Sequence, residues 1–339
     1  MKKIRDTILV VYIMVSGIDV CAQDPTFSQF FSSPLNVNPA LTANISSDWR
    51  AISNYRSQWM NDGSPYVTGT VSFDSKVLQH KNAYLPEGNY LGLGSMLMFD
   101  RAMQGVAKAS YASFSLSYNA RLKDGNTKHR LGMGFAGMYG RRYVDYSQLD
   151  FEEQYTGSGF NVNLPTGEAA LLDMKPLFSV STGITYSISN ENSNLDIGVA
   201  AFHVNRPRQT LLQDDNQRLA IRKVAHVNFE TFINDRTIFN TAAIYQLQGS
   251  ARYVSAGAGI GYYPGDDDSP MINAGLWYWA ENGLVPFLGV VYNNVQFGFT
   301  YDFTLSKLNE SALKPRSIEL SIIFRGNRNP SKIIPCPWK

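Results

Sequence analysis

Residues 295–304 restrict the chain to extended structure more strictly than any other stretch. In VQFGFTYDFT, an apolar residue alternates with a small or polar one at every step. Successive side chains of a β-strand point to opposite faces, so Phe297, Phe299, Tyr301 and Phe303 share one face. The other face carries no large apolar residue. Repeated segments of this kind are typical of transmembrane β-barrels, whose outer face contacts lipid and whose interior is polar.

The same alternation recurs along the whole sequence. We predict an all-β fold, a transmembrane antiparallel β-barrel of about 14 strands, because single-chain bacterial barrels have an even number of strands. The prediction includes a short N-terminal periplasmic segment. Besides 295–304, the predicted strands are residues 49–59, 66–74, 91–100, 112–119, 131–139, 178–188, 195–204, 224–233, 238–248, 252–263, 271–280, 284–292 and 317–324.

Composition leaves two other architectures open and excludes one class of partner. With 339 residues, 44% hydrophobic and 17% charged, the chain is long enough for one large domain. A soluble extracellular β-sandwich would alternate in a similar way, and an open barrel would be a diffusion porin or solute transporter. A net charge of +2 provides no basic surface for nucleic acid.

The first 22 residues have the pattern of a secretory signal peptide. Lys2, Lys3 and Arg5 precede an apolar run, and small residues precede a cleavage site predicted after Ala22. This predicts export and an outer-membrane location. A lipoprotein anchored through Cys21 is disfavoured, because Val20 stands where a lipid-attachment motif has a small residue and Asp19 is an unfavourable neighbour. Cys336 would then be the only cysteine, which excludes an intramolecular disulfide.

Three regions follow the predicted signal peptide. Residues 23–47 are rich in proline, so we expect an irregular segment packed on or in the barrel. The barrel itself is predicted over residues 48–325, with the long connections 142–175 and 205–222 outside the cell. Residues 326–339 are predicted to form a periplasmic tail, either disordered or docked to a partner through Ile333, Ile334, Cys336 and Trp338.

The sequence predicts no catalytic, metal or cofactor site, and therefore a protein that is not an enzyme. His80, His129, His203 and His226 have no metal-ligand spacing, and residues 266–268 form an acidic turn without the pattern of a calcium loop. No nucleophile elbow or phosphate-binding loop is present. Glycines inside strand 131–139 are expected to relieve crowding or to allow bending; they are Gly132, Gly134 and Gly137.

Polar residues on the first two strands and the last strand are candidates for a network in the lumen. They are Arg50, Asn54, Arg56, Asp74 and Glu319. The first and last strands of a closed barrel are neighbours, so Arg50 or Arg56 could meet Asp74 or Glu319. The network would anchor the N-terminal segment, or the residues would line an ordinary solvated lumen. If Phe299 faces lipid and Thr300 faces the lumen, we expect Phe299→Arg to impair membrane assembly and Thr300→Arg to be tolerated.

Three parts of the sequence carry a resemblance to a known family. Residues 24–41 (DPTFSQFFSSPLNVNPAL), 49–59 (WRAISNYRSQW) and the strand from 66 to 74 resemble the PorP/SprF family. The resemblance returns at His203, Asn205, Pro207 and Gln209, and in residues 315–337. It implies an outer-membrane β-barrel of the type IX secretion and gliding system. The implied partners are a secreted adhesin or its C-terminal domain, periplasmic motor and anchoring components, and outer-membrane lipid.

Overall fold

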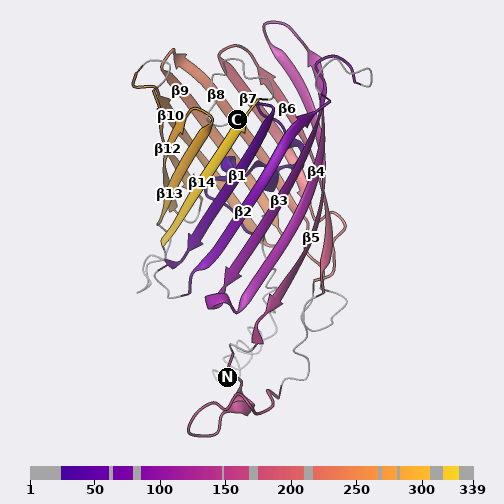
Figure 1. Ribbon diagram of the computed structural model, residues 1–339, viewed down its shortest axis with the longest axis vertical. Helices are drawn as coiled ribbons and strands as arrows, with labels where there is room; N and C mark the ends of the chain where they lie inside the picture. Colours follow the sequence, from indigo (N-terminus) through magenta and orange to yellow (C-terminus); the bar gives the residue numbers. More distant parts are fainter. Residues whose placement is uncertain are drawn as a thin grey trace, which may run out of the picture.

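Fourteen antiparallel strands close into one barrel (Figure 1). The computed structural model describes residues 24–60, 64–78, 85–146, 149–167, 175–209, 217–265, 269–280, 283–305 and 316–327. Each strand pairs with its neighbours in sequence, and β1 closes the barrel by pairing with β14, where Arg56 lies opposite Glu319. The predicted fold class and strand number are confirmed. The closed sheet excludes the β-sandwich.

The strands differ in length around the barrel, and the longest are β4 and β5. Their bounds are β1 Trp49–Gln58, β2 Tyr66–Val77, β3 Tyr90–Ala102, β4 Ala107–Lys123, β5 Lys128–Val144, β6 Leu177–Ser189, β7 Ser193–Phe202, β8 Arg222–Asn234, β9 Thr237–Gln248, β10 Ala251–Tyr262, β11 Met271–Trp279, β12 Gly283–Tyr292, β13 Val295–Thr304 and β14 Arg316–Gly326. Within the described residues, no helix is long and apolar enough to cross a membrane.

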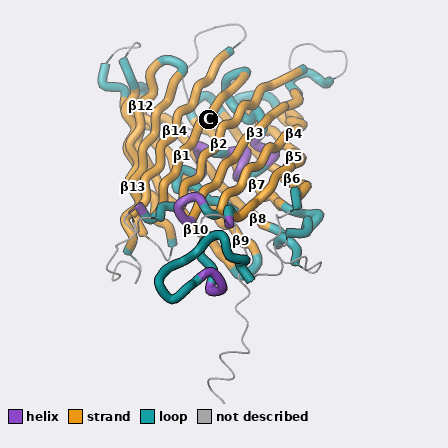
Figure 2. Tube along the Cα trace, turned by 60° about the horizontal axis from the view of Figure 1, so that its bottom comes forward, coloured by secondary structure: helices purple, strands orange, loops and turns teal. Residues whose placement is uncertain are grey.

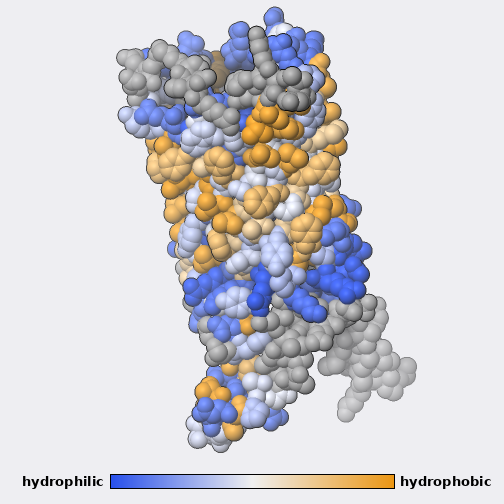
Figure 3. Space-filling model, turned by 45° about the vertical axis from the view of Figure 1, so that its right-hand side comes forward, coloured by the Kyte–Doolittle hydropathy of each residue, from blue (hydrophilic) through white to orange (hydrophobic). Residues whose placement is uncertain are grey.

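The alternation in β13 becomes two different environments in the barrel. Phe297 and Phe299 are 52% and 41% exposed on the outer face, whereas Gln296 and Thr300 are buried toward the lumen. The same division on other strands forms an apolar belt around the outer surface, bounded by more polar bands (Figure 3). This surface matches a bilayer, in which outward side chains contact lipid and the closed sheet satisfies every strand's backbone hydrogen bonds.

The two ends of the barrel carry connections of different length. The connections 145–176 and 203–221 lie at the end where β5 and β7 finish, which we call the long-loop mouth. The opposite end, the short-turn mouth, holds the start of β1 and the turns 124–127, 190–192, 235–236 and 293–294. This separation follows the expected loop pattern. The connection 78–89 is an exception, because it is fairly long and lies at the short-turn mouth.

Residues 24–48, which we call the lumen segment, fold inside the ring of strands (Figure 2). The segment contains three short helices: η1 (Phe30–Ser32), α2 (Pro34–Val37) and η2 (Pro39–Leu41). Pro34 and Pro39 each occupy the first turn of a helix, where a missing N–H costs no hydrogen bond. From the sequence we predicted a short N-terminal periplasmic segment, irregular and packed on or in the barrel. The structure places it within the barrel, because its backbone and side chains bond to lumen-facing residues.

Phe299→Arg tests which face of β13 contacts lipid. Phe299 lies near the middle of β13 on the outer face, and an arginine at the bilayer midplane of a barrel costs about 2 to 4 kcal/mol. We expect markedly less heat-modifiable, membrane-inserted barrel for this variant. Phe299→Leu keeps an apolar residue at the same place and should assemble normally. Equal assembly of both variants would contradict the assigned facing.

Candidate functional site

The lumen segment runs antiparallel to β1, from the long-loop mouth to the short-turn mouth. Three side chains of β1 donate hydrogen bonds to its carbonyl groups in reverse order. Arg56 reaches Thr26 O at 2.7 Å, Asn54 reaches Ser32 O at 3.1 Å, and Arg50 reaches Leu41 O at 3.4 Å. Since β1 starts at the short-turn mouth, the chain at residue 24 lies at the long-loop mouth.

Arg56 and Glu319 form the centre of the charge network near the start of the segment. Arg56 Nη2 lies 2.8 Å from Asp302 Oδ2, and Arg56 Nη1 lies 3.7 Å from Glu319 Oε2. Glu319 accepts hydrogen bonds from the backbone N–H groups of Ser28 and Gln29, at 2.8 and 3.0 Å. The carboxylate therefore satisfies two donors that an irregular segment cannot pair with itself.

Arg50 and Asp74 form a second buried pair near the end of the segment. Arg50 donates to both oxygens of Asp74, at 3.0 and 2.7 Å. Asp74 Oδ2 also accepts the N–H of Ala43 at 2.7 Å. Asn54 donates to Thr70 of β2 as well as to the segment. Each of the five residues selected from the sequence thus contacts the lumen segment directly, and Arg56 meets Glu319 as the closed barrel allows.

Asp24 anchors the first described residue of the segment at the long-loop mouth. Its Oδ2 lies 2.6 Å from His203 Nε2 and 3.3 Å from Arg222 Nε, and its N–H donates to Gln248 at 2.8 Å. Burial raises the pKa of Asp24, but the Arg222 charge and the His203 hydrogen bond outweigh it, so the pKa lies below its usual value. Asp24 and His203 both belong to stretches that resemble PorP/SprF, and the structure brings these distant residues together.

Asn38 joins the segment to the β6–β7 wall. Its amide nitrogen lies 3.2 Å from both Ile184 O and Val199 O, while its side-chain oxygen accepts the N–H of Ala40 at 2.8 Å and caps η2. Glycines of the neighbouring strands leave the space that this side chain occupies. A Cβ atom at Gly183 or Gly198 would collide with it. Asn38 is completely buried.

Gly134 brings the segment backbone directly onto the wall. A Cβ atom at this position would collide with backbone atoms of Pro39 and Ala40. At Gly132, two residues earlier on the same face, a Cβ atom would instead collide with the side chains of Thr185 and Asn119 on the neighbouring strands. Gly137 points outward instead and meets only the Phe178 ring. Gly134 therefore relieves crowding against the segment, whereas Gly132 relieves crowding against the neighbouring strands.

An aromatic cluster inside the lumen packs the segment against β11 and β12, across the lumen from β5 and β6. The Phe31 ring lies 4.8 Å from the Trp277 ring and 5.4 Å from the Phe287 ring, measured between centroids. Trp277 and Phe287 are fully buried. Neither residue was predicted from the sequence, because the lumen of a barrel was expected to be polar. The near-continuous apolar run of residues 284–292 was the available signal for Phe287, since a strand with apolar residues toward both lipid and lumen has no alternation.

Thr300 shows how this packing changes an expectation from the sequence. The residue faces the lumen as predicted, but it is 1% exposed and lies 3.4 Å from the Gln29 side-chain amide. An arginine has no room there without displacing the segment, so tolerance of Thr300→Arg is no longer expected.

A pocket of about 50 Å³ between the segment and β8 and β9 has room for only a few water molecules.

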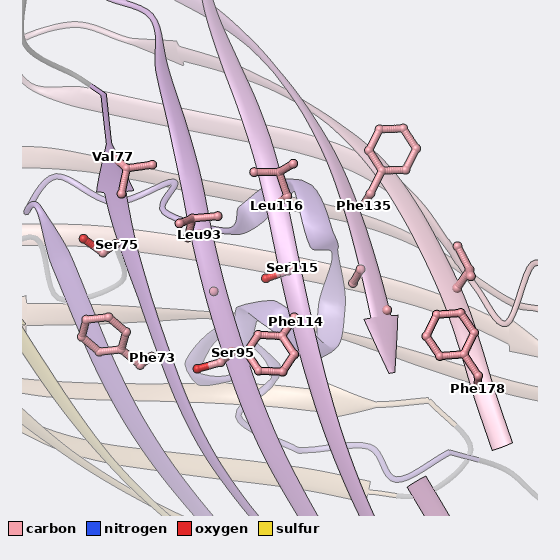
Figure 4. Close-up of a pocket in the computed structure, with 14 residues that line it drawn as sticks. Phe73, Ser75, Val77, Leu93, Ser95, Phe114, Ser115, Leu116, Phe135 and Phe178 are labelled. Atoms are coloured by element: carbon pink, nitrogen blue, oxygen red, sulfur yellow. The ribbon is translucent and has the colours of Figure 1, made fainter. Parts of the chain in front are cut away.

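A larger groove lies outside the barrel, on the outer face of β2–β6 (Figure 4). It measures about 830 Å³ and is lined largely by phenylalanine and leucine side chains, among them Phe73, Leu93, Phe114, Phe135 and Phe178. Ser95 and Gly137 leave the space between these rings. The groove belongs to the lipid-facing belt and is separate from the lumen.

Several residues named from the sequence lie outside the described part of the chain. They are the signal peptide, His80, the acidic turn 266–268, and the tail residues Ile333, Ile334, Cys336 and Trp338. The described structure ends at Asn327, whose side chain accepts the N–H of Asp48 at 2.9 Å at the short-turn mouth. Among the described residues, no group of three or more His, Cys, Asp or Glu side chains is placed to hold a metal ion.

One known protein family matches most of the length of the chain. Residues 20–324 match the family described as type IX secretion system membrane protein PorP/SprF. The chain belongs to the PorP/SprF family. The resemblance noted in the sequence is confirmed, and the plugged barrel is the form that this member takes. Comparison with curated proteins finds no match.

Solved structures share the architecture at low sequence identity. The TodX deltaS2S3 mutant monoaromatic hydrocarbon channel has a TM-score of 0.51 and 10% identity, over 87% of this chain and 94% of that one. The Pseudomonas putida toluene transporter TodX has a TM-score of 0.49 and 11% identity, over 91% and 95%. CdiB from Escherichia coli has a TM-score of 0.43 and 10% identity, over 81% and 63%. The first of these shows the barrel fold and nothing about the cargo.

Substituting Gly134 tests whether the segment is packed on β5. We expect Gly134→Ala to leave the barrel heat-modifiable but to loosen the segment, because overpacking costs about 1 to 3 kcal/mol. Hydrogen exchange of the amides of residues 38–44 should rise roughly tenfold. Gly137→Ala, on the outer face of the same strand, should leave that exchange unchanged. Equal exchange in the two variants would mean that the segment does not rest on Gly134.

Cysteine labelling tests the direction of the segment. In a Cys336→Ser background, a cysteine inserted before Asp24 should react with a membrane-impermeant maleimide on intact cells, as should Val162→Cys at the long-loop mouth. Asp235→Cys, in an exposed turn at the short-turn mouth, should react only after permeabilisation. If the inserted cysteine behaves like the one at position 235, the segment enters the lumen from the opposite end.

Proposed function

We propose that this PorP/SprF barrel is an outer-membrane binding component of the type IX secretion system that supports secretion or surface attachment of large adhesins. The observation that carries the proposal is the filled lumen. Residues 24–48 are bonded to the wall at both mouths, by Asp24 to His203 and by Asp74 to Ala43. A lumen occupied in this way favours action by protein binding over passage of cargo through the same barrel.

The charge network fixes the segment in one position. Arg50, Arg56, Asp74 and Glu319 are each at most 6% exposed at the side chain. Removing one partner from such a buried pair leaves an uncompensated charge and typically costs about 3 to 5 kcal/mol. Withdrawal of the segment would break at once the hydrogen bonds that the Arg50–Asp74 pair and the Arg56–Glu319 pair make to it. We therefore treat barrel and segment as one rigid body that presents its loops and tail to other proteins.

The proposed partners follow the two mouths. A secreted adhesin, or its C-terminal domain, would bind at the long-loop mouth, and periplasmic motor and anchoring components would bind at the short-turn mouth. The second site would include Ile333, Ile334, Cys336 and Trp338, because β14 ends at Gly326 beside Trp49 at that mouth. An export signal over residues 1–22 fits this arrangement and remains part of the proposal, as does a role in gliding.

A diffusion porin or solute transporter is the competing function. The likeness to TodX concerns the fold and does not bring hydrocarbon transport to this chain. In planar bilayers, the purified barrel should show no stable open-pore conductance while Asp24, Glu319 and Asp74 hold the segment. Steady ohmic channels formed by the correctly folded wild-type protein would favour the porin.

Truncation after Asn327 tests the binding role. The variant should fold and insert normally, because the ladder hydrogen bonds of β14 end at Gly326. Adhesin at the cell surface should fall several-fold, measured by antibody binding on intact cells. Ile333→Ser with Trp338→Ser should reproduce the loss, whereas Lys332→Ser should not. Normal display from the inserted, truncated barrel would rule out docking through the tail.

A further inference from the structure

The β5–β6 connection carries a small ordered unit beyond the long-loop mouth. Residues 149–167, which we call the projecting loop, extend away from the barrel at the bottom of Figure 1. The unit contains η6 (Glu152–Gln154) and an antiparallel bridge between Tyr155 and Phe160. Asn161 N–H donates to Gln154 O at 2.8 Å, and Thr156 N–H donates to Gly159 O at 3.0 Å. The loop therefore has its own internal hydrogen bonds.

Gln154 holds the two sides of the projecting loop together. Its side-chain oxygen accepts the N–H of Phe151 at 3.2 Å, and its side-chain nitrogen donates to Leu164 O at 3.0 Å. The residue is 4% exposed, although the surrounding loop lies far from the barrel core. A loop preorganised in this way loses little conformational entropy when it binds, which favours affinity.

Part of the surface of this unit is apolar. Tyr155 is 55% exposed, Phe160 52% and Val162 68%. The rings of Tyr155 and Phe160 lie 5.2 Å apart, and Leu164 adds a further exposed side chain. Figure 3 shows apolar atoms on the unit at the bottom, separated from the lipid-facing belt by a polar band. Lipid contact does not account for their exposure there, and adjacent exposed apolar residues mark an interaction surface.

The charge of the loop indicates the chemistry of its partner. Asp150, Glu152 and Glu153 are its charged residues, and it contains no lysine or arginine. Anionic lipid headgroups would repel this surface. We propose that the projecting loop docks into an apolar groove, rimmed by lysine or arginine, on a secreted protein at the cell surface. This inference rests on the proposed function for the outward orientation of the long-loop mouth and for the presence of such a protein.

Photo-crosslinking in intact cells tests the inference on the full chain. With p-benzoylphenylalanine at Val162, we expect one protein adduct, and none with the probe at Glu191 in an exposed turn of the short-turn mouth. Phe160→Ser should reduce the adduct at least tenfold. Glu152→Gln with Glu153→Gln should reduce it severalfold and remove its sensitivity to salt. An absent adduct, or one unchanged by both sets of substitutions, would overturn the proposal.

A second measurement separates a protein partner from lipid. The Val162→Cys, Cys336→Ser protein carries an environment-sensitive dye and is reconstituted in vesicles of phosphatidylethanolamine and lipopolysaccharide. The emission should match that of the protein in detergent, because the dye remains in water. A blue shift in vesicles alone would assign the loop to lipid and overturn the proposal.

The failures of the two proposals are distinguishable. If deleting the whole barrel leaves adhesin display normal while the Val162 adduct keeps its dependence on Phe160 and on the two glutamates, the role in display is wrong and the docking surface stands. If display depends on the barrel but Phe160→Ser leaves the adduct unchanged, the docking surface is wrong and the proposed function stands. Heat-modifiability of each variant verifies that the barrel has folded.

Discussion

The need to satisfy the backbone of an irregular chain inside a closed barrel governs this structure. A helix pairs its own N–H and C=O groups and a strand pairs them with neighbouring strands, but a proline-broken segment can do neither along its length, and unpaired buried groups cost free energy. The barrel wall supplies the missing partners. Glu319 accepts two N–H groups, Asp74 accepts a third, and Arg50 and Arg56 donate to carbonyl groups. The segment and the wall are therefore complementary along its length.

Buried charge makes this complementarity specific. Ion pairs removed from water contribute little net stability, because desolvation offsets their attraction. They do penalise every arrangement that leaves one partner unpaired. Shifting the segment by one residue along β1 would leave Asp74 without the Ala43 N–H and Glu319 without two donors. Gly134 and the aromatic cluster around Trp277 also favour this one position of the segment, because the segment fits against them sterically. Because the lumen of this rigid barrel is filled, partners would bind at its loops and ends, where the connecting segments tolerate sequence variation.

The sequence was most informative where lipid imposes a pattern. Outward apolar residues such as Phe297 and Phe299 can be predicted from alternation alone, because a bilayer accepts little else. The charged residues could also be selected as a set, since neighbouring first and last strands could bring Arg56 to Glu319, and Arg50 and Asp74 lie on adjacent strands. That these residues bind the lumen segment could not be predicted, because lumen-facing polar residues show the same sequence pattern whether they contact water or protein. Trp277 and Phe287 escaped prediction for the opposite reason: an apolar residue in the lumen breaks the expected pattern.

The sequence by itself determined the strand number, the lipid-facing side of strands with clear alternation, such as β13, and the family, because each depends on local periodicity or on contiguous motifs. Only the tertiary structure decided that residues 24–48 fill the lumen, that Asp24 lies at the long-loop mouth and that His203 holds it there. Those features depend on pairings between residues far apart in the sequence, 179 positions for Asp24 and His203 and 291 for Ser28 and Glu319, which no local pattern encodes. They arise when the closing of β1 against β14 brings the wall around the segment and gives its unpaired backbone groups their partners.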